Sequence, residues 1–348
     1  MMAQHTTHTR SEADTMQALT YDAYRSIDSV HLCEVAPPTL KDDQIRIRTH
    51  AAAFNAADAL MLRGEPFMIR GMTGGPRRPR RNFVLGRDVA GVIEAVGSAV
   101  RDLQVGDAVF GEAQGAMAEM VCVKASAVVL KPDSLCFEQV ASLPVAAVTA
   151  LQAVRDRGRV ANGQRVLVNG ASGGVGSFAV QIAASYGAQV TAVCSTPHLD
   201  LMRRIGASEV IDYTTSDITQ MPSTAPYDVI IDLVGNHSLA ALRRILTPTG
   251  TLVLTAGAGG PIAGPVMRML RAALISARPG VTQHLRPHTS KVNRDDLQTL
   301  ADLLRSGTVV PVIARTYPLA AAPSAMRQFV EGHDAGKIVV TMPANAAA

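Results

Sequence analysis

Hydrophobic and polar residues alternate with period two in the first third of this chain. The clearest case is residues 44–49, Gln-Ile-Arg-Ile-Arg-Thr, and such alternation is typical of a half-buried strand. Similar short strands are predicted at 89–96, 108–110 and 117–123, separated by Gly-Asp and Gly-Ser turns. We therefore expect a β-rich first domain with the character of a partly open barrel.

The middle of the chain follows a different pattern. Continuous apolar strands are predicted at 164–169, 189–194, 209–211, 228–233 and 251–255, and helical segments lie between them, including 175–186, one that ends at Gly206, and 238–246. Alternating helices and continuous apolar strands predict a parallel sheet covered on both faces. The fold class is therefore predicted as α/β, with a doubly wound sheet after the β-rich domain.

The remaining segments complete this outline. A helical region at 136–154 connects the two predicted domains, and prolines interrupt the chain at 261, 265, 279 and 287. Helices are then expected at 295–305 and 321–331, with strands at 309–314 and 337–341. Residues 265–276 are apolar except for Arg268 and Arg271, which favours an amphipathic helix or lid over a segment that touches a membrane.

A glycine-rich turn follows the first strand of the predicted parallel sheet. It reads A-x-G-x-x-G from Ala171, with Ala171 at the usual first glycine. Small residues let the backbone approach a dinucleotide pyrophosphate, and the free N–H groups of the next helix point at its charge. The alternative is an ordinary strand–turn–helix connection rich in small residues. The predicted phosphate-binding residues are Gly170, Ala171, Ser172, Gly173, Gly174, Val175 and Gly176.

Composition narrows the possible function classes. The 348 residues are 47% hydrophobic and 18% charged, with a formal charge of +4, and a chain of this length is expected to hold two domains. No apolar run approaches the roughly 18 residues of a membrane-spanning helix, so membrane insertion is not expected. Arginines gather between residues 70 and 87 among glycines and prolines, which predicts a mobile solvated loop. Aromatic residues make up 4% and tryptophan is absent, so no nucleic-acid partner is expected.

Cysteine usage and the N-terminus bear on location. The cysteines at 33, 122, 136 and 194 show no CxxC spacing, as expected of reduced thiols rather than a disulfide or zinc framework. The N-terminus lacks the apolar core of a secretory signal, and residues 1–15 are polar and predicted to be a disordered tail. These features predict a cytoplasmic protein.

The chain resembles the medium-chain dehydrogenase/reductases, in their zinc-independent quinone oxidoreductase (zeta-crystallin-like) branch. The resemblance extends from residue 16 to 342 and is carried by segments 52–58, 63–64, 84–92, 105–109, 147–151, 170–176, 206–213 and 336–340. It implies a GroES-like catalytic domain at 16–140, a Rossmann dinucleotide-binding domain at 141–282 and a C-terminal segment, 283–348, that returns to the first domain. A homodimer is compatible with it, although the sequence itself does not show one.

Two departures from the zinc-dependent branch argue against a metal. Those enzymes carry a cysteine where this chain has Asn55 and a histidine where it has Arg87. A zinc site needs about four N or S ligands, and a guanidinium repels the ion. We therefore expect no zinc.

The end of the second parallel strand bears on the choice of cofactor. NAD enzymes place an acidic residue there for the ribose 2′-hydroxyl, whereas residues 194–198 read Cys-Ser-Thr-Pro-His. Hydroxyl groups donate to a 2′-phosphate, which favours NADPH over NADH, although the same residues could simply form a loop and helix cap. The predicted contacts on this side are Ser195, Thr196, His198 and Tyr213.

On the nicotinamide side, the resemblance implies a second set of residues. Asn55 could instead cap a helix, Thr149 could be a packed helical residue, and Lys337 could be exposed or packed. Asp58 and Asp88 match family positions and are expected to be structural carboxylates. The predicted residues are Asn55 and Thr149 as catalytic, positioning groups, and Val234, Gly235, Thr255, Gly257 and Lys337 as cofactor contacts.

The resulting hypothesis is NADPH-dependent hydride transfer to a small, hydrophobic, electron-poor acceptor in the interdomain cleft. The acceptor would be a quinone or an α,β-unsaturated carbonyl. Relatives often have a tyrosine where this chain has Leu60, so no general acid is evident and solvent is expected to deliver the proton. Two alternatives remain open: a metal-free, NADP-dependent alcohol dehydrogenase or carbonyl reductase, and a non-catalytic NADPH-binding regulatory protein.

Overall fold

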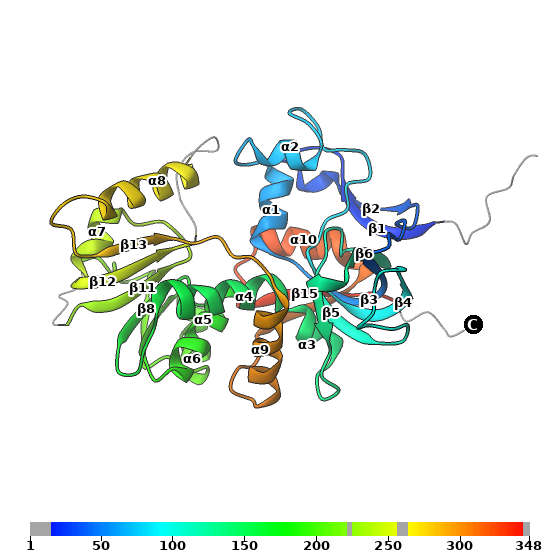
Figure 1. The fold of residues 1–348 in the computed structure, drawn as a ribbon. Helices are drawn as coiled ribbons and strands as arrows, with labels where there is room; N and C mark the ends of the chain where they lie inside the picture. The colour runs from blue at the N-terminus through cyan, green and yellow to red at the C-terminus, as the bar shows by residue number, and fades with distance from the viewer. Residues whose placement is uncertain (1–14, 221–224, 256–263, 344–348) are drawn as a thin grey trace, which may run out of the picture.

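Two bodies, each built around a large sheet with its own helices, lie side by side (Figure 1). The computed structural model describes residues 15–220, 225–255 and 264–343. The N-terminal body holds a seven-stranded sheet and a separate two-stranded sheet, and the other body holds a six-stranded sheet. The predicted α/β class with two unlike sheets is confirmed.

The seven-stranded sheet is built around β3 (Gln44–Ala53), which pairs with β4 (Asp88–Val96), β15 (Lys337–Thr341) and β6 (Met120–Lys124). The order continues through β5 (Ala108–Glu112) and β7 (Val128–Leu130) on one side and β14 (Ile313–Pro318) on the other. In β3 the side chains of Ile45, Ile47 and Thr49 are buried in alternation, because successive residues of a strand point to opposite faces. The two-stranded sheet joins β1 (Met16–Tyr21) to β2 (Val30–Val35).

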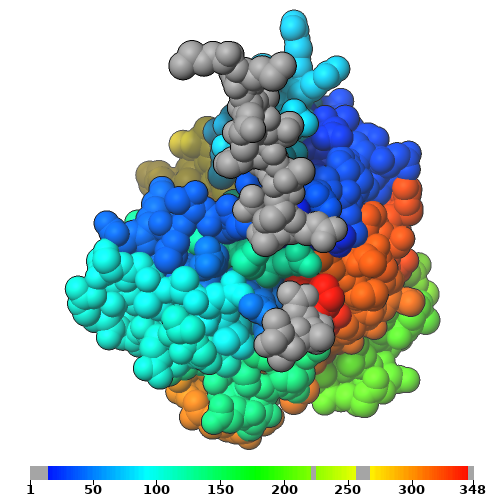
Figure 2. Space-filling view, turned by 90° about the vertical axis from the view of Figure 1, so that its right-hand side faces the viewer, coloured from blue at the N-terminus to red at the C-terminus, as the bar shows by residue number. Residues whose placement is uncertain are grey.

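The end of the chain completes the sheet that its beginning starts. β15 pairs antiparallel with β3, with Val339 opposite Ala53, and α10 (Ala322–Glu331) contacts β2. Figure 2 shows the C-terminal segment in orange and red packed beside the blue N-terminal segments. This agrees with the return of the C-terminal segment that the resemblance implies, while the four domain limits stay predictions.

The six-stranded sheet is parallel throughout and has the order β10-β9-β8-β11-β12-β13. Numbered along the chain this is 3-2-1-4-5-6, the order of a Rossmann fold, in which ligands bind at the carboxyl edge where the order reverses. The strands are β8 (Arg165–Asn169), β9 (Gln189–Cys194), β10 (Glu209–Asp212), β11 (Tyr227–Asp232), β12 (Leu246–Leu254) and β13 (His284–Pro287).

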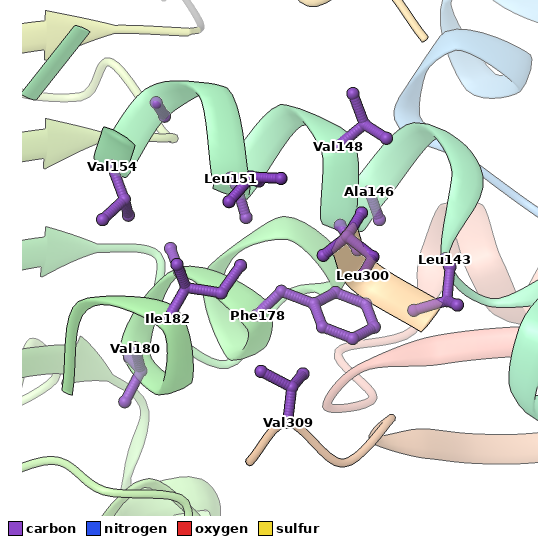
Figure 3. Packing of buried hydrophobic residues seen from close by; sticks show 14 of the residues in the cluster. Leu143, Ala146, Val148, Leu151, Val154, Phe178, Val180, Ile182, Leu300 and Val309 are labelled. Atoms are coloured by element: carbon purple, nitrogen blue, oxygen red, sulfur yellow. The ribbon is translucent and has the colours of Figure 1, made fainter. Parts of the chain in front are cut away.

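Helices of both bodies share one apolar core. In Figure 3, residues of α4 (Pro144–Gln152), α5 (Gly174–Ser185) and α9 (Arg294–Arg305) pack together, among them Leu151, Phe178 and Leu300. Phe178 and Leu151 are fully buried, and burying a side chain of this kind stabilises the fold by about 1.5–3 kcal/mol. This core holds α4, with Thr149, against the start of α5.

Local chemistry explains where the observed elements differ from the predicted ones. The helix expected at 136–154 is divided into α3 (Phe137–Ala141) and α4, because Pro144 lacks an N–H and can begin a helix but not continue one. The strand expected at 309–314 starts later, at Ile313. The helix expected at 238–246 is α7 (Leu239–Arg244), capped by the Ser238 side chain, and β12 begins one residue after the helix ends.

The arginine-rich segment is more ordered than its composition suggests. It includes α2 (Ile69–Thr73), which follows α1 (Ala56–Arg63). Arg70 donates to the carbonyl oxygens of Gly64 and Pro76 at 3.0 and 2.7 Å, and its guanidinium lies over the Tyr24 ring. The prediction of a mobile loop is therefore wrong at its start, where Arg70 fastens α2 to the domain. The helix expected at 265–276 is α8 (Gly264–Ser276).

The other described helical segments are short. They are α6 (Leu199–Arg204), a π-helical turn over Ala153–Gly158, and single 3₁₀ turns over Ile27–Ser29, Ala125–Ala127, Thr196–His198 and Leu319–Ala321.

Candidate active site

A cleft of about 820 Å³ opens between the two bodies. Its walls come from α1, α4, the loop between β8 and α5, and the carboxyl ends of β11, β12 and β13. It lies where the strand order of the parallel sheet reverses, which is between the neighbouring strands β8 and β11. The lining residues that the argument uses are Asn55, Leu60, Arg87, Glu112, Thr149, Asn169, Tyr213, Val234, Thr255, His288 and Ser290, together with Gly170, Ser172, Gly173, Gly174, Val175 and Gly176.

The glycine turn has the geometry of a phosphate cradle. Gly170 adopts φ +85°, a conformation that L side chains rarely adopt. A Cβ at Gly176 would lie 2.2 Å from the carbonyl oxygen of Gly170, so only glycine lets the helix start so close to the strand. Gly173 is exposed at the cap of α5, and the first N–H groups of that helix have no intrahelical partner. These residues fit a pyrophosphate group, whose charge the helix N-terminus favours.

Ala171 explains why the first glycine of the motif is dispensable here. Its side chain is fully buried, and its N–H donates to the carbonyl oxygen of Val193 on β9 at 2.9 Å. It therefore supports the turn from below instead of lining the cleft.

Asn55 belongs to a buried polar network. Its Nδ2 donates to Asp88 Oδ2 at 2.8 Å, and its Oδ1 accepts from Lys337 Nζ at 2.6 Å. Lys337 Nζ also donates to the carbonyl oxygen of Phe54 at 2.7 Å and to Asp88 Oδ2 at 3.0 Å. All three N–H donors of the ammonium thus have protein acceptors. The network fixes the orientation of the Asn55 amide at the cleft wall.

A second buried carboxylate holds the backbone around this network. Asp58 accepts from the backbone N–H of Asn55 at 2.8 Å and from that of Gly86 at 2.9 Å. Burial raises the pKa of Asp58 to about 6, against the opposing effect of these two hydrogen bonds. Asp88 accepts in addition from the N–H of Val145 at the start of α4. The two acids are structural carboxylates in this structure, and Asp88 connects the N-terminal sheet to α4.

Thr149 and His288 also line the cleft and contact each other. Thr149 Oγ1 donates to the Val145 carbonyl at 2.6 Å and lies 2.7 Å from Ser290 Oγ. His288 Nε2 lies 3.2 Å from the Thr149 carbonyl oxygen, while burial lowers the pKa of His288 below its usual value. A neutral ring that donates through Nε2 leaves Nδ1 as an acceptor, and this buried Nδ1 has no partner in the described ranges. An unpartnered acceptor beside the cleft suits an amide donor such as a nicotinamide carboxamide.

The turn after β11 is held by Asp232. Its Oδ1 accepts from the N–H of Gly235 and from Asn169 Nδ2, both at 2.9 Å. Its Oδ2 accepts from Arg268 on α8 at 2.7 Å. Val234 is exposed to the cleft, whereas Gly235 is buried behind it. Arg268 thus links the α8 helix to the predicted cofactor loop.

The predicted 2′-phosphate contacts lie at the end of β9. Thr196 Oγ1 donates to Asp212, which also accepts from the N–H and hydroxyl of Thr214. These hydrogen bonds, that from Thr196 first, lower the pKa of Asp212. His198 Nε2 lies 2.8 Å from the His333 carbonyl oxygen. Sequence reasoning found no acid near this position because Asp212 is 16 residues beyond Thr196 and arrives there through β9–β10 pairing.

The cleft brings together most of the predicted residues, but not all of them. Ser195, Thr196 and His198 lie outside its described lining, and Lys337 borders a smaller neighbouring cavity of about 250 Å³. Gly257 lies outside the described residues. Sequence reasoning missed Glu112, Asn169, His288 and Ser290. The place of Asn169 at the end of β8 was a usable signal, whereas Ser290 and His288 follow a strand that had not been predicted.

The described residues hold neither a group of metal-binding side chains nor a membrane-spanning helix. Among residues 15–220, 225–255 and 264–343, no three His, Cys, Asp or Glu side chains are grouped so that they could hold a metal ion. Within the same ranges, no helix combines the length and apolar character that crossing a membrane requires.

Both halves of the chain match known domain families. Residues 41–133 match the family described as alcohol dehydrogenase GroES-like domain, and residues 205–340 match the one described as zinc-binding dehydrogenase.

Whole-chain relatives agree with these matches. The Bos taurus protein named NAD(P)H oxidoreductase RTN4IP1, mitochondrial, is 32% identical, with 96% of this chain and 91% of the relative aligned. The Arabidopsis thaliana protein named NADPH-dependent alkenal/one oxidoreductase, chloroplastic, is 33% identical over 93% of this chain and 79% of its own length. The structure of the quinone oxidoreductase from Coxiella burnetii superposes with a TM-score of 0.84 at 28% identity, covering 94% of this chain and all of that one.

These relatives correct one expectation. The bovine, mouse and human relatives are named as mitochondrial, and the Arabidopsis alkenal/one oxidoreductase as chloroplastic. They point away from the cytoplasmic location predicted above, so that prediction is wrong. The cysteine pattern and the composition of the N-terminal residues do not distinguish the cytoplasm from an organelle.

Proposed function

We propose that this chain reduces small electron-poor acceptors with NADPH and without a metal. The premise is that the chain belongs to the medium-chain dehydrogenase/reductase superfamily and is a quinone oxidoreductase-like oxidoreductase. The acceptor is a quinone or an α,β-unsaturated carbonyl bound in the cleft between the two bodies. Relatives named as an alkenal/one oxidoreductase and a quinone oxidoreductase support this class of acceptor.

One observation carries the proposal. The same cleft joins a phosphate cradle at Gly170–Gly176 to an apolar pocket wall that includes Leu60 and Val145. The same lining includes two oriented polar groups, the Asn55 amide and the Thr149 hydroxyl. A cofactor bound along the cradle would reach the apolar end with its nicotinamide, where a hydrophobic acceptor also fits.

When bound, the reduced nicotinamide supplies the hydride, and the chain supplies orientation and exclusion of water. Asn55, fixed by Asp88 and Lys337, and Thr149, fixed by Ser290, hold hydrogen-bonding groups at the cleft wall. The cleft lining contains no tyrosine other than Tyr213, on the Rossmann side of the described site. The proton that completes the reduction therefore comes from solvent in this proposal.

The donor set supports a metal-free site. The amide oxygen of Asn55 accepts a hydrogen bond from the Lys337 ammonium group. Arg87, which stands where zinc-dependent relatives carry a histidine ligand, presents a guanidinium. Zinc prefers thiolate and neutral imidazole ligands, so neither residue suits it, although the matching family is described as zinc-binding.

Two features at the end of β9 act in opposite directions on cofactor choice. Ser195 and Thr196 supply hydroxyls in place of the usual acid of an NAD enzyme, which favours NADPH. The Asp212 carboxylate accepts a hydrogen bond from the Thr196 hydroxyl, and its negative charge disfavours binding of a 2′-phosphate there. We propose that NADPH remains preferred, with Asp212 limiting how strong the preference is.

A turnover assay on the purified chain tests the proposal. NADPH and NADH oxidation would be followed with a quinone, an enone and a simple ketone, before and after treatment with a chelator. We expect turnover of the quinone and enone, higher kcat/KM with NADPH, and no loss after chelation. Reduction of the ketone alone would support a carbonyl reductase instead. Tight NADPH binding without turnover of any acceptor would support a regulatory protein.

A further inference from the structure

Arg87 occupies a rigid position on the cleft wall. It lies between Gly86, whose N–H donates to Asp58 Oδ1 at 2.9 Å, and the fully buried Asp88. Its own carbonyl oxygen accepts from the N–H of Ala113 at 2.8 Å. Two buried carboxylates and a strand contact therefore fix the backbone from which the side chain extends.

The guanidinium of Arg87 is held by one partner and has donors to spare. It forms an ion pair with Glu112, which lies beside it across the β4–β5 pair. The two side chains are 36% and 22% exposed, and both line the cleft with Asn55 and Thr149. A guanidinium carries five N–H donors, and Glu112 is its only hydrogen-bond acceptor in the ranges that the structure describes.

Arg87 also differs from the other cations near the cleft. The Lys337 ammonium has acceptors for all three of its N–H groups. Arg268 is bound to Asp232 and to the His237 carbonyl, and although its buried Nε has no partner in the described ranges, the residue lies outside the described cleft lining. Among the described lining residues, Arg87 is the one arginine or lysine. It is therefore the permanent positive charge that a substrate in the cleft would meet.

We infer that Arg87 binds the carbonyl oxygen of the acceptor and stabilises the negative charge that forms there during reduction, while Glu112 holds the guanidinium in place. This rests on the proposed function. In the reduction of an enone, a C–H bond of the dihydronicotinamide would break and leave the oxidised cofactor one positive charge, and the hydride would form a new C–H bond at the β-carbon. The alkene π pair becomes the new double bond of an enolate, and the carbonyl π pair moves onto oxygen. Water then protonates the α-carbon and is left as hydroxide, so the charges balance.

The chemistry explains why an arginine suits this position. Without a Lewis acid, charge on the oxygen needs a hydrogen-bond donor that is fixed before the reaction. Arginine stays protonated at all relevant pH values, so it polarises the carbonyl but does not transfer a proton to it. Acceptors with little activation of their own depend most on such help, and strongly electron-poor quinones depend on it least.

The test compares Arg87→Gln and Arg87→Ala with the wild-type chain on enones of graded electron demand and on a quinone. Arg48→Gln serves as the matched control, because Arg48 forms a half-exposed ion pair with Glu94 on β3 and β4, and neither lines the cleft. NADPH affinity is measured by fluorescence titration and folding by thermal unfolding. Added guanidinium ion at low concentration tests rescue of Arg87→Ala.

We expect Arg87→Gln to bind NADPH as the wild type does and to lose about 10²- to 10³-fold in kcat on weakly activated enones, as when one donor to an oxyanion is removed. The loss should shrink on the quinone, and guanidinium should partly restore Arg87→Ala. Equal losses on every acceptor, weakened NADPH binding, or unchanged turnover would each overturn the inference. A wild-type chain that reduces no enone or quinone would overturn the proposed function and this inference together. An active wild type with an unaffected variant overturns the inference alone.

Discussion

The ammonium group of Lys337 lies 3.0 Å from the carboxylate of Asp88, although 249 residues separate them. Their side chains are 3% and 0% exposed. The pair joins β15, near the end of the chain, to the start of β4, and Asn55 bridges the two groups. The closing strand therefore does more than complete a sheet, because it carries the charge that balances a buried acid at the cleft wall.

Lys337→Met should strongly destabilise the protein. The variant leaves Asp88 and the Asn55 amide buried without their cation, and breaking a buried ion pair typically costs about 3–5 kcal/mol. Denaturant unfolding of both chains measures the difference. Arg327→Ala removes an exposed ion pair with Asp28 and should change little. A similar small effect for both variants would contradict this account.

The stability of the protein should carry a pH dependence that comes from Asp58. Burial raises its pKa in the folded state from 3.8 to about 6, so between these values the folded chain binds more protons than the unfolded chain. The contribution is complete below about pH 4 and is lost as the pH rises through 6, for a total on the order of 2–3 kcal/mol. The measured free energy of unfolding should therefore fall by this amount as the pH rises across this range.

Asp58→Asn separates this component from other titrations. The variant should be less stable, since an amide cannot accept from both the Asn55 and Gly86 N–H groups as a carboxylate does. Its free energy of unfolding should nevertheless depend less on pH between 4 and 6 than that of the wild type. Asp22→Asn, at an exposed carboxyl, should reproduce the wild-type profile. If Asp58→Asn also kept that profile, another group would be responsible.

Two glycines of the phosphate cradle should respond differently to alanine. In Gly176→Ala the new Cβ would lie 2.2 Å from the Gly170 carbonyl oxygen, so the turn must move, and both thermal stability and NADPH binding should fall. In Gly173→Ala the nearest atom is 3.6 Å away, so stability should hold. Because Gly173 is exposed on the cleft side, its added methyl should still weaken NADPH binding, by roughly tenfold if it costs about 1.4 kcal/mol of binding energy. Titration and thermal unfolding of both variants distinguish these effects. If both variants bound NADPH as the wild type does, the pyrophosphate would not bind at this turn.

Asp212→Asn should increase the preference for NADPH. The variant removes a negative charge that Thr196 and Thr214 hold at the end of β9, and a 2′-phosphate is repelled by that charge while a 2′-hydroxyl is not. The ratio of kcat/KM with NADPH to that with NADH should rise several-fold. Asp217→Asn, at an exposed acid bound to Thr219, is the control and should leave the ratio unchanged. A fall in the ratio after Asp212→Asn would show that the carboxylate positions the hydroxyls for the phosphate.

Much of the fold could be predicted because its signals are local. The turn from Gly170 to Gly176 and the strand at 189–194 were predicted within a residue or so, since glycine conformation, apolar runs and helical spacing act over a few positions. Errors arose where a neighbour in space changes a local preference. Pro144 divides one predicted helix, and Arg70 fastens a segment that composition alone assigns to a mobile loop.

The candidate site could be predicted only in part. Asn55, Thr149, Tyr213, Val234 and Thr255 were expected at the cofactor and line the cleft. The partner of each polar group could not be predicted, because the hydrogen bonds of Asn55 to Asp88 and Lys337 join residues that are 33 and 282 positions apart. For the same reason, the position of Asp212 beside Thr196 at the end of β9 could not be predicted.

By itself, the sequence predicted most of the strands and helices and the glycine turn after β8, since each depends on residue type and short-range spacing. The tertiary structure alone decided which charges are neutralised and which remain available. Lys337 is buried against Asp88 with every donor occupied, whereas Arg87 faces the cleft and has no acceptor besides Glu112 among the residues that the structure describes. Two cations that look alike in a sequence differ here because burial forces a charge to find partners, and only the packing of the closing strand against the first sheet provides them.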